Sequence, residues 1–476
     1  MLDLLRHRAR DAPGRPAVQE HIGDTWRTTT WAELYTAAQA AAARAARLRA
    51  GSGPVTVVLD NSAASVAALV GLLSSSLDVL CVERADLGPP ADHVVAPVGT
   101  PGAAPGLTHQ DLTAPLGGLA PEPHGGPRPG TASGEAAVLQ VTSGSTGQPR
   151  VVRHRVSAVL HGAGLYRDLY GVTDRDKVLL PLPFAHSFGL VGGLTCALLS
   201  GAVLLTSPVF RLRAVHAALA AGASVLLGSP LLYDLLAASA ADGCAAPRLR
   251  VALSSGGPLS PRTAEAAEAV LGVPVSQVYG STETGLIACW LPGEPTVPGS
   301  VGTAAPGVTW RLGAAEEGGH RLLVRTDTML LGYHGPLGTE PDPDGYFDTG
   351  DLAVVDAVGR LRITARKSTF INVGGRKVNP QRVEARAEDH PLVREAKAFG
   401  RARGNEQEVH MAVVVEDPVA VDATVITSFL RAGLAPHEVP RHLHFLNRLP
   451  RTSLGKVNLP ALLQSIPAET AYDHGQ

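Results

Sequence analysis

Short apolar runs alternate with helix-length patterns through the first part of the chain. The clearest runs are 55–59, 202–206, 224–227 and 251–253, and a weaker one follows at 275–278. Each has the length and composition of a buried strand. Repeated strand–helix alternation predicts an α/β fold with doubly wound parallel sheets. Ligands bind such sheets at the carboxyl ends of the strands, so the segments that follow these runs are where we expect a site.

Helix boundaries are marked by local signals. Thr30 to Glu33 has the form of a capping box and opens an alanine-rich helix that is expected to stop at Gly51. Asn61 or Ser62 begins the next helix. The stretch 99–133 is rich in Gly, Pro and Ala, which predicts a long loop.

Composition limits the class of protein. With 476 residues, 45% of them hydrophobic and 18% charged, the chain is expected to form two or three globular domains. A formal net charge of −2 argues against a nucleic-acid partner. The four scattered cysteines and the absence of a secretory signal indicate a reducing, cytoplasmic location. The uncharged stretch 188–210 is split by Ser200-Gly201, which favours a buried helix and strand over a membrane span.

A loop rich in hydroxyls and glycines follows the apolar run 136–141. Gly lets a backbone approach phosphate oxygens closely, and Ser and Thr hydroxyls can donate to them. The loop is not a Walker motif, because G-x-x-x-x-G-K-[ST] is absent; by itself it could equally be a surface linker. Its candidate polyphosphate contacts are Thr142, Ser143, Gly144, Ser145, Thr146 and Gly147.

Four further segments occur in a fixed order after this loop: 279–285 (YGSTETG), 345–352 (GYFDTGDL), 359–366 running into 372–378 (GRLRITAR and NVGGRKV), and 450–456 (PRTSLGK). Together the five segments resemble the adenylate-forming superfamily, in its branch of acyl-CoA synthetases and AMP-dependent ligases. The resemblance covers residues 25 to 460. Each motif alone is weak, but five in this order are specific.

The resemblance implies two domains. Residues 1–366 would form a large AMP-binding domain with doubly wound sheets and a small β subdomain. Residues 367–476 would form a small, mobile α+β domain that carries Lys456 and rotates between two catalytic poses. The hinge position two after Arg366, commonly Asp or Lys in relatives, is Ser368 here, and the usual lysine of the first loop is Arg150.

The resemblance also implies roles in nucleotide binding. Lys456 would neutralise charge on the α-phosphate, Thr282 would donate to that phosphate, and Glu283 would hold Mg²⁺, which favours carboxylate oxygens. Asp351 and Arg366 would bind the ribose hydroxyls. The ordinary alternatives are a surface lysine, a core aromatic and a turn aspartate. The remaining nucleotide contacts are expected to be Tyr279 against adenine, Ser255, Gly256 and Gly257 on its other side, and Gly280 and Ser281.

By the same resemblance, His186 borders the carboxylate pocket, although a satisfied buried histidine is the alternative. Gly285 would leave room in the pocket, and Gly374 and Gly375 would pass a pantetheine arm. An α-amino acid substrate is disfavoured, because no acid lies between Leu182 and Val209 to bind its ammonium group.

The implied reaction uses ATP and Mg²⁺ to convert a small carboxylic acid into an acyl- or aryl-adenylate, with release of pyrophosphate. The acyl group then passes to CoA. A phosphopantetheine on a carrier protein, or an amine, in a natural-product pathway is an alternative acceptor, and a homodimer is left open. A non-catalytic nucleotide-binding module is the alternative of another class.

Overall fold

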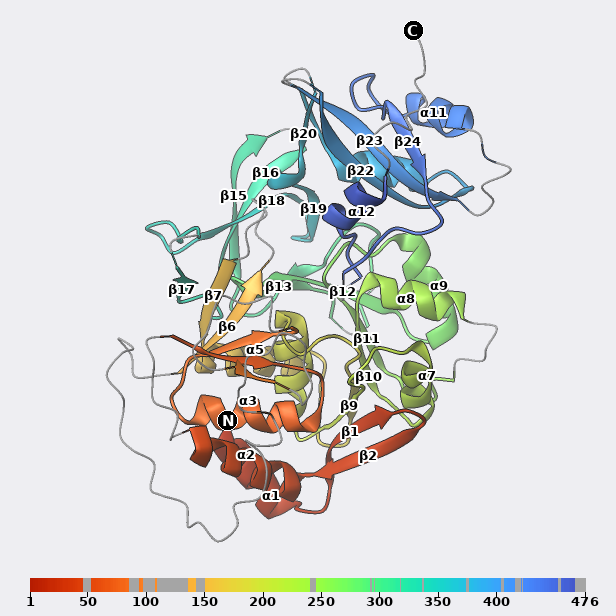
Figure 1. Cartoon of the computed structure of the whole chain (residues 1–476). Helices are drawn as coiled ribbons and strands as arrows, with labels where there is room; N and C mark the ends of the chain where they lie inside the picture. Colours follow the sequence, from red (N-terminus) through yellow and green to blue (C-terminus); the bar gives the residue numbers. More distant parts are fainter. Residues whose placement is uncertain are drawn as a thin grey trace. The chain divides into compact units, whose positions relative to one another are not determined.

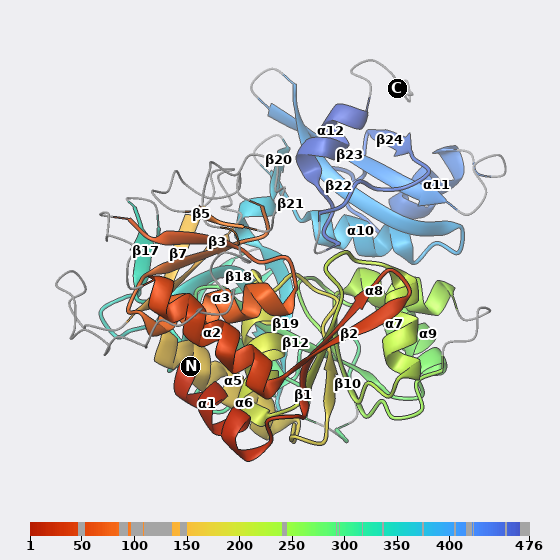
Figure 2. The same cartoon turned by 60° about the horizontal axis from the view of Figure 1, so that its bottom comes forward.

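The computed structural model of the chain (Figures 1 and 2) divides into two compact units. The first contains residues 1–310 and 324–347, and the second contains 311–323 and 348–476. The structure describes all residues except 46–52, 85–93, 97–107, 109–135, 143–149, 240–244, 292, 295, 317, 336–337, 374–375, 404–405, 416–420, 422, 453–454 and 467–476. Most of the loop expected at 99–133 therefore lies outside the described residues.

A nine-stranded sheet forms one part of the first unit, in the order β14-β13-β12-β11-β10-β8-β9-β1-β2. The strands from β12 to β1 run parallel, and antiparallel strands close both edges. The bounds are β1 (Pro16–Ile22), β2 (Thr25–Thr30), β8 (Lys177–Leu179), β9 (Val203–Thr206), β10 (Val225–Gly228), β11 (Val251–Ser254), β12 (Val275–Ser281), β13 (Gly285–Cys289) and β14 (Thr303–Ala304).

A six-stranded sheet has the order β17-β7-β6-β4-β3-β5. Strands β6, β4, β3 and β5 are parallel, whereas β6–β7 and β7–β17 are antiparallel. The predicted α/β architecture with large parallel sheets is confirmed. The bounds are β3 (Val55–Val58), β4 (Val79–Val82), β5 (Val94–Val95), β6 (Ala137–Thr142), β7 (Arg150–Arg155) and β17 (Gly332–His334).

The helices of the first unit begin where the sequence signals indicate. Thr30 and Glu33 form the predicted capping box: the Thr30 N–H donates to Glu33 at 2.8 Å, and the Glu33 N–H donates to Thr30 Oγ1 at 3.3 Å. Ser62 caps the next helix. The expected end at Gly51 lies outside the described residues. The bounds are α1 (Leu2–Asp11), α2 (Trp31–Ala45), α3 (Ala63–Ser74), α5 (Val156–Leu169), α6 (Cys196–Ser200), α7 (Leu212–Ala220), α8 (Pro230–Ala238) and α9 (Pro261–Leu271).

The uncharged stretch that begins at Phe188 is a buried helix followed by a buried strand, as predicted. It forms the π-helix η2 (Phe188–Thr195), then α6, and after the left-handed Gly201 it continues as β9. Among the described residues, no helix is long and apolar enough to cross a membrane. In Figures 1 and 2, α1, α2 and α3 lie side by side.

The second unit contains three sheets. A four-stranded sheet has the order β15-β16-β18-β19, and a two-stranded hairpin, β20–β21, confirms the hairpin expected at 370–378. A three-stranded sheet has the order β22-β23-β24. The bounds are β15 (Thr309–Glu316), β16 (Gly319–Arg325), β18 (Phe347–Val355), β19 (Leu361–Arg366), the 3-10 turn η4 (Lys367–Thr369), β20 (Ile371–Val373), β21 (Arg376–Val378), α10 (Pro380–Glu388), β22 (Val393–Arg403), β23 (Glu406–Val415), α11 (Ala423–Arg431), β24 (His442–Phe445) and α12 (Leu459–Ser465).

The expected domain boundary at Arg366–Lys367 falls between β19 and η4. The division into compact units runs earlier, so this boundary lies inside the second unit. Its role as a hinge stays a prediction about motion. Ser368, the residue noted there, is within η4.

Strand β23 has a buried side chain on each face of its sheet. Met411 and Val413 pack with α10 and α11, whereas Ala412 and Val414 pack with Phe399 and the end of α12. The second face also carries histidines. Burial and then the neighbouring imidazoles lower the pKa of His410 to about 4, and burial and then Arg401 lower the pKa of His444 to about 4.

Candidate active site

Strands β6 and β7 position the ends of the hydroxyl-rich loop. Thr142, the last residue of β6, is the register partner of Arg150, the first residue of β7. The predicted strand before the loop is thereby confirmed, and the loop closes an antiparallel pair. Its other candidate phosphate contacts, Ser143, Gly144, Ser145, Thr146 and Gly147, lie outside the described residues, and their role stays a prediction.

The turn between β12 and β13 contains Thr282 and Glu283. Every backbone carbonyl of this turn has a partner: Thr282 O contacts His154 Nε2 at 2.6 Å, and Glu283 O accepts from the Leu330 N–H at 2.8 Å. Thr284 O accepts from Thr328 Oγ1 at 2.6 Å and from Thr326 Oγ1 at 2.9 Å. Because buried carbonyls without partners are costly, these bonds hold the turn in one conformation.

Two glycines make this turn possible. A Cβ on Gly280 would lie 2.3 Å from the carbonyl oxygen of Gly285, its neighbour across the hairpin. Gly285 has φ +75°, and a Cβ there would lie 2.5 Å from Thr328 Oγ1. Only glycine fits either position without displacing the backbone or Thr328. The structure thus assigns Gly285 to the turn itself, and its expected place in the acyl pocket stays a prediction.

Tyr333 of β17 links this turn to the hydroxyl-rich loop. Its hydroxyl donates to Glu283 Oε1 at 3.3 Å, and it is the register partner of Val152 on β7. Burial, followed by the Glu283 charge, raises the pKa of Tyr333 to about 12, against a hydrogen bond and charge from Arg150. Glu283, Tyr333 and Arg150 therefore lie together, although the sequence gave no signal for Tyr333.

His186 lies in a segment that the neighbouring elements fix on three sides. Asn61 Nδ2 donates to Leu182 O at 2.8 Å, and Gln140 Nε2 donates to Ala185 O at 2.7 Å. Ser187 Oγ is 3.3 Å from Thr282 Oγ1. The histidine segment and the Thr282 turn are therefore neighbours, as expected of residues that share one site.

The His186 side chain is in contact with the carboxylate of Glu83, which directly follows β4. Its side chain is 31% exposed, so it is neither fully buried nor without a partner. The absence of an acid between Leu182 and Val209 had disfavoured an amino acid substrate. That inference considered the local sequence alone, and the fold brings the Glu83 carboxylate to His186 from another strand. Its premise is therefore corrected.

Strands β11 and β12 position the proposed adenine contacts. Ser254 on β11 pairs with Gln277 on β12, so the loop after β11 and Tyr279 follow neighbouring parallel strands. Gln277 Nε2 donates to Gly257 O at 3.3 Å, and the Ser255 N–H donates to Gly228 O at 3.1 Å. Gly256 lies between them in this loop. Gln277 was missed by sequence reasoning because nothing in its local pattern differs from an ordinary strand residue.

The second unit holds the remaining site residues. Asp351 on β18 is the register partner of Arg366 on β19, with Arg366 Nε 3.6 Å from Asp351 Oδ1. Burial among protein atoms, followed by the Arg366 charge, lowers the pKa of Lys456, while Asp351 opposes this. Lys456 nevertheless keeps an exposed surface, so we rely on the direction alone. The three residues thus form one charged group, and Gly374 and Gly375 lie outside the described residues.

The segment that contains Lys456 is held close to β22. Arg451 donates to Gly455 O at 2.5 Å and to Glu395 Oε2 at 2.6 Å, and the Thr452 N–H donates to Lys456 O at 2.8 Å. These bonds fix the backbone on both sides of Lys456. The lysine side chain is therefore presented from an ordered turn.

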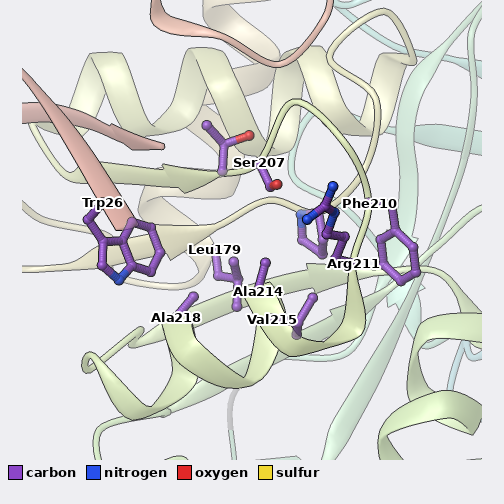
Figure 3. A pocket seen from close by; sticks show the side chains of 10 residues that line it. Trp26, Leu179, Ser207, Phe210, Arg211, Ala214, Val215 and Ala218 are labelled. Atoms are coloured by element: carbon purple, nitrogen blue, oxygen red, sulfur yellow. The ribbon is translucent and has the colours of Figure 1, made fainter. Parts of the chain in front are cut away.

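A separate hollow lies at the other end of the nine-stranded sheet (Figure 3). It encloses about 280 Å³, part of it open to solvent. Trp26 lies at one end and Phe210 at the other, with Ala214, Val215 and Ala218 of α7 along its floor. Strand β2, which carries Trp26, is the opposite edge from the β12–β13 turn. None of the predicted site residues lines this hollow.

Comparisons with known proteins match most of the chain. The family model described as AMP-binding enzyme matches residues 104–334, and the model of its C-terminal domain matches residues 382–456. Indoleacetate–CoA ligase of Aromatoleum aromaticum is 30% identical over 344 residues, which cover 69% of this chain and 67% of that protein. A probable 2-succinylbenzoate–CoA ligase of Mycobacterium tuberculosis is 30% identical over 70% of this chain and 86% of that protein.

A solved structure has the same fold. It is the O-succinylbenzoate coenzyme A synthetase of Bacillus subtilis, in complex with ATP and magnesium ion. Its TM-score is 0.79 at 22% identity, over 97% of this chain and 99% of that chain. At this identity the likeness concerns the fold alone.

Proposed function

Because the chain belongs to the family of AMP-binding enzymes, in its acyl-CoA synthetase branch, we propose that it is an AMP-forming acid–thiol ligase. It activates a small carboxylic acid with ATP and passes the acyl group to CoA. One observation carries the proposal: the fully bonded β12–β13 turn brings Thr282 and Glu283 beside both Ser187 and Tyr333. A histidine segment and a phosphate-loop strand thereby converge on one carboxylate and one hydroxyl.

The first half-reaction requires charge neutralisation more than a base. A carboxylate oxygen attacks the α-phosphorus of ATP, the bond from that phosphorus to the bridging oxygen breaks, and pyrophosphate leaves. The attacking anion and the triphosphate repel each other, so cations and hydroxyl donors around the α-phosphate lower the barrier. We assign this task to Lys456, Thr282 and Arg150.

Glu283 fits a Mg²⁺ ion. It supplies hard carboxylate oxygens, it is half-buried, and Tyr333 holds its Oε1. When bound, Mg²⁺ neutralises charge on the phosphates. Tyr333 restricts the carboxylate to one orientation, which lowers the entropic cost of binding the ion.

In the second half-reaction the CoA sulfur attacks the acyl carbonyl, and AMP leaves. We place His186 beside the carboxylate of the acid, with Glu83 fixing its ring. Asp351 would accept hydrogen bonds from the ribose hydroxyls, and Arg366 would orient Asp351 from the neighbouring strand. We further propose that rotation at Arg366–Lys367 presents Lys456 in the first half-reaction and withdraws it in the second.

Acid-dependent exchange of labelled pyrophosphate into ATP tests the first step. We expect exchange with at least one member of a panel of aryl, short-chain, medium-chain and dicarboxylic acids. No exchange with any of them would overturn the proposal in favour of a nucleotide-binding module. Glu283→Gln is the matched variant, because it keeps the shape of the side chain and removes its charge.

Acceptors are tested separately with the acid that supports exchange. CoA, a carrier protein with its phosphopantetheine arm, and simple amines are supplied in parallel, and product is measured by mass spectrometry. We expect the CoA thioester; the carrier thioester or the amide alone would move the proposal to that acceptor. A cytoplasmic location fits the reduced, buried Cys81, Cys196 and Cys289. The homodimer stays a prediction for light scattering to test.

A further inference from the structure

Strands β23 and β24 carry four metal-ligating side chains on one face of their sheet. Successive side chains of a strand point to opposite faces, so Glu408 and His410 share a face, as do His442 and His444. The two strands are parallel, with His410 opposite His442 and Ala412 opposite His444. The register therefore brings three imidazoles and one carboxylate together, without any contribution from the site described above.

The donor atoms of Glu408, His410 and His442 all lie within 4.8 Å of one another. His442 Nε2 is 3.5 Å from Glu408 Oε2. Ligands bound tetrahedrally to Zn²⁺ at about 2.0–2.2 Å are separated from each other by about 3.3–3.6 Å. The His442–Glu408 separation already has this value, and small rotations of the side chains would bring the third ligand into place.

His444 is placed to support such a site from behind. Its Nε2 is 3.0 Å from His410 Nδ1, and the two rings are nearly parallel, at an interplanar angle of 12°. A metal-bound histidine commonly uses its second ring nitrogen for a hydrogen bond that fixes the ring. His444 would therefore orient His410, and it does not need to bind the ion itself.

Aromatic packing explains only part of this cluster. Phe399 lies against His410 and His444, with ring centroids at 5.7 and 6.1 Å. Packing does not account for His442, whose Nδ1 is buried without a hydrogen-bond partner among the described residues. Nor does it explain a carboxylate directed at an imidazole. A second neighbour of Glu408 is Arg441, 3.4 Å away, but its side chain is 66% exposed, and exposed ion pairs are weak.

We propose that Glu408, His410 and His442 bind a divalent transition-metal ion of the Zn²⁺ type, with His444 as the residue that positions His410. Two imidazoles and a carboxylate are a common ligand set for this ion. The bound ion would join β23 to β24 and stabilise the second unit. The site is independent of ligase activity, because none of its residues has been assigned to nucleotide or acid binding.

Zinc binding is tested on the full chain without nucleotide. Protein freed of metal by a chelator is titrated with Zn²⁺ against a chromophoric competitor, in a Glu283→Gln background that removes the carboxylate proposed for Mg²⁺. We expect one ion per chain and at least tenfold weaker binding in Glu408→Gln and in His442→Gln. His161→Gln, which alters an exposed histidine of α5, is the matched control and should bind as the parent does.

Cobalt gives a second readout that depends on ligand geometry. Co²⁺ in the parent protein should produce the intense visible absorption of a tetrahedral site, and His442→Gln should lose it. Zn²⁺ should also raise the thermal midpoint of the parent but not that of the variants, because an ion that binds only folded protein stabilises it. Circular dichroism checks that each variant is folded, and Glu408→Gln decides the matter if His442→Gln is not.

Equal zinc affinity in the parent and in Glu408→Gln would overturn the proposal. So would absence of stoichiometric binding by the parent. Zinc bound with octahedral cobalt absorption would show only adventitious surface sites and would also overturn it.

Discussion

Glu83 and His186 are in direct side-chain contact, although one follows β4 and the other precedes η2. The two residues come from the two large sheets' connecting segments, and Asn61 and Gln140 fix the backbone beside the histidine. A carboxylate on a histidine sets the orientation and tautomer of its ring. Glu83 is therefore a positioning residue of the proposed acid pocket.

Glu83→Gln should reduce the exchange reaction about tenfold in kcat/KM for the acid, because the ring of His186 loses its fixing charge. The KM for ATP should not change. A cycle with His186→Ala decides whether the two act together: the double variant should be no worse than His186→Ala alone. Additive losses would mean that Glu83 acts elsewhere. Glu265→Gln, on the exposed surface of α9, is the matched control.

Tyr333→Phe should raise the Mg²⁺ concentration needed for half-maximal exchange by a few fold, because Glu283 loses the hydroxyl that orients it. The maximal rate at saturating Mg²⁺ should stay close to that of the parent. Tyr35→Phe, a change of the same kind in α2, is the control. An unchanged Mg²⁺ requirement would contradict the link between Tyr333 and the metal.

Lys456→Ala should abolish adenylation but largely spare thioester formation from a supplied acyl-adenylate. The cation is needed on the α-phosphate only while pyrophosphate leaves. Lys177→Ala, in the first unit, serves as the control. Equal loss of both half-reactions would contradict the role assigned to Lys456.

Adenylation by the parent should also have an alkaline limit below that of an ordinary lysine. Burial and Arg366 lower the pKa of Lys456, so its ammonium loses its proton at a lower pH than usual. Lys456→Arg should move this limit upward, because a guanidinium stays charged. A pH–rate profile of the exchange reaction measures it, and an identical limit in both proteins would assign the titration to another group.

Asp176→Asn should destabilise the first unit by about 3 kcal/mol, because it removes one partner of a buried, charged network. Asp176 accepts from Arg250 at 2.9 and 3.0 Å, from the Thr173 N–H and from Ser224. Burial alone would raise the pKa of Asp176, but these donors lower it overall. Its contribution is therefore present above the pKa of the unfolded carboxyl and is lost as the pH falls through the lowered folded value.

Urea unfolding at neutral pH measures the Asp176→Asn effect. Asp24→Asn, whose side chain is 79% exposed, is the control and should change stability little. The difference between Asp176→Asn and the parent should shrink below pH 4, which is about where free aspartate titrates. A constant difference across this range would show that packing, and not charge, explains the loss.

Local patterns predicted the secondary structure well where each element has its own signal. The capping box at Thr30, the cap at Ser62 and the strands at 251–253 and 275–278 all lie where the sequence indicates them. These signals depend on neighbouring residues alone. The glycine-dependent β12–β13 turn is local too, because Gly280 and Gly285 lie within the same motif.

The missing parts of the site are those that the sheets assemble. Glu83, His154, Gln277, Thr328 and Tyr333 come from different strands and loops, and none lies in a recognisable motif. Each contributes a hydrogen bond or a charge to a motif residue. Such partners depend on strand order, which alternation alone does not determine.

A crystal structure with a non-hydrolysable acyl-adenylate analogue tests the central claim most directly. The account predicts adenine between Tyr279 and the 255–257 loop, the α-phosphate at Thr282, the ribose hydroxyls at Asp351, and the acyl group beside His186. A nucleotide bound away from Tyr279 and Asp351, or an acyl group remote from His186, would contradict it.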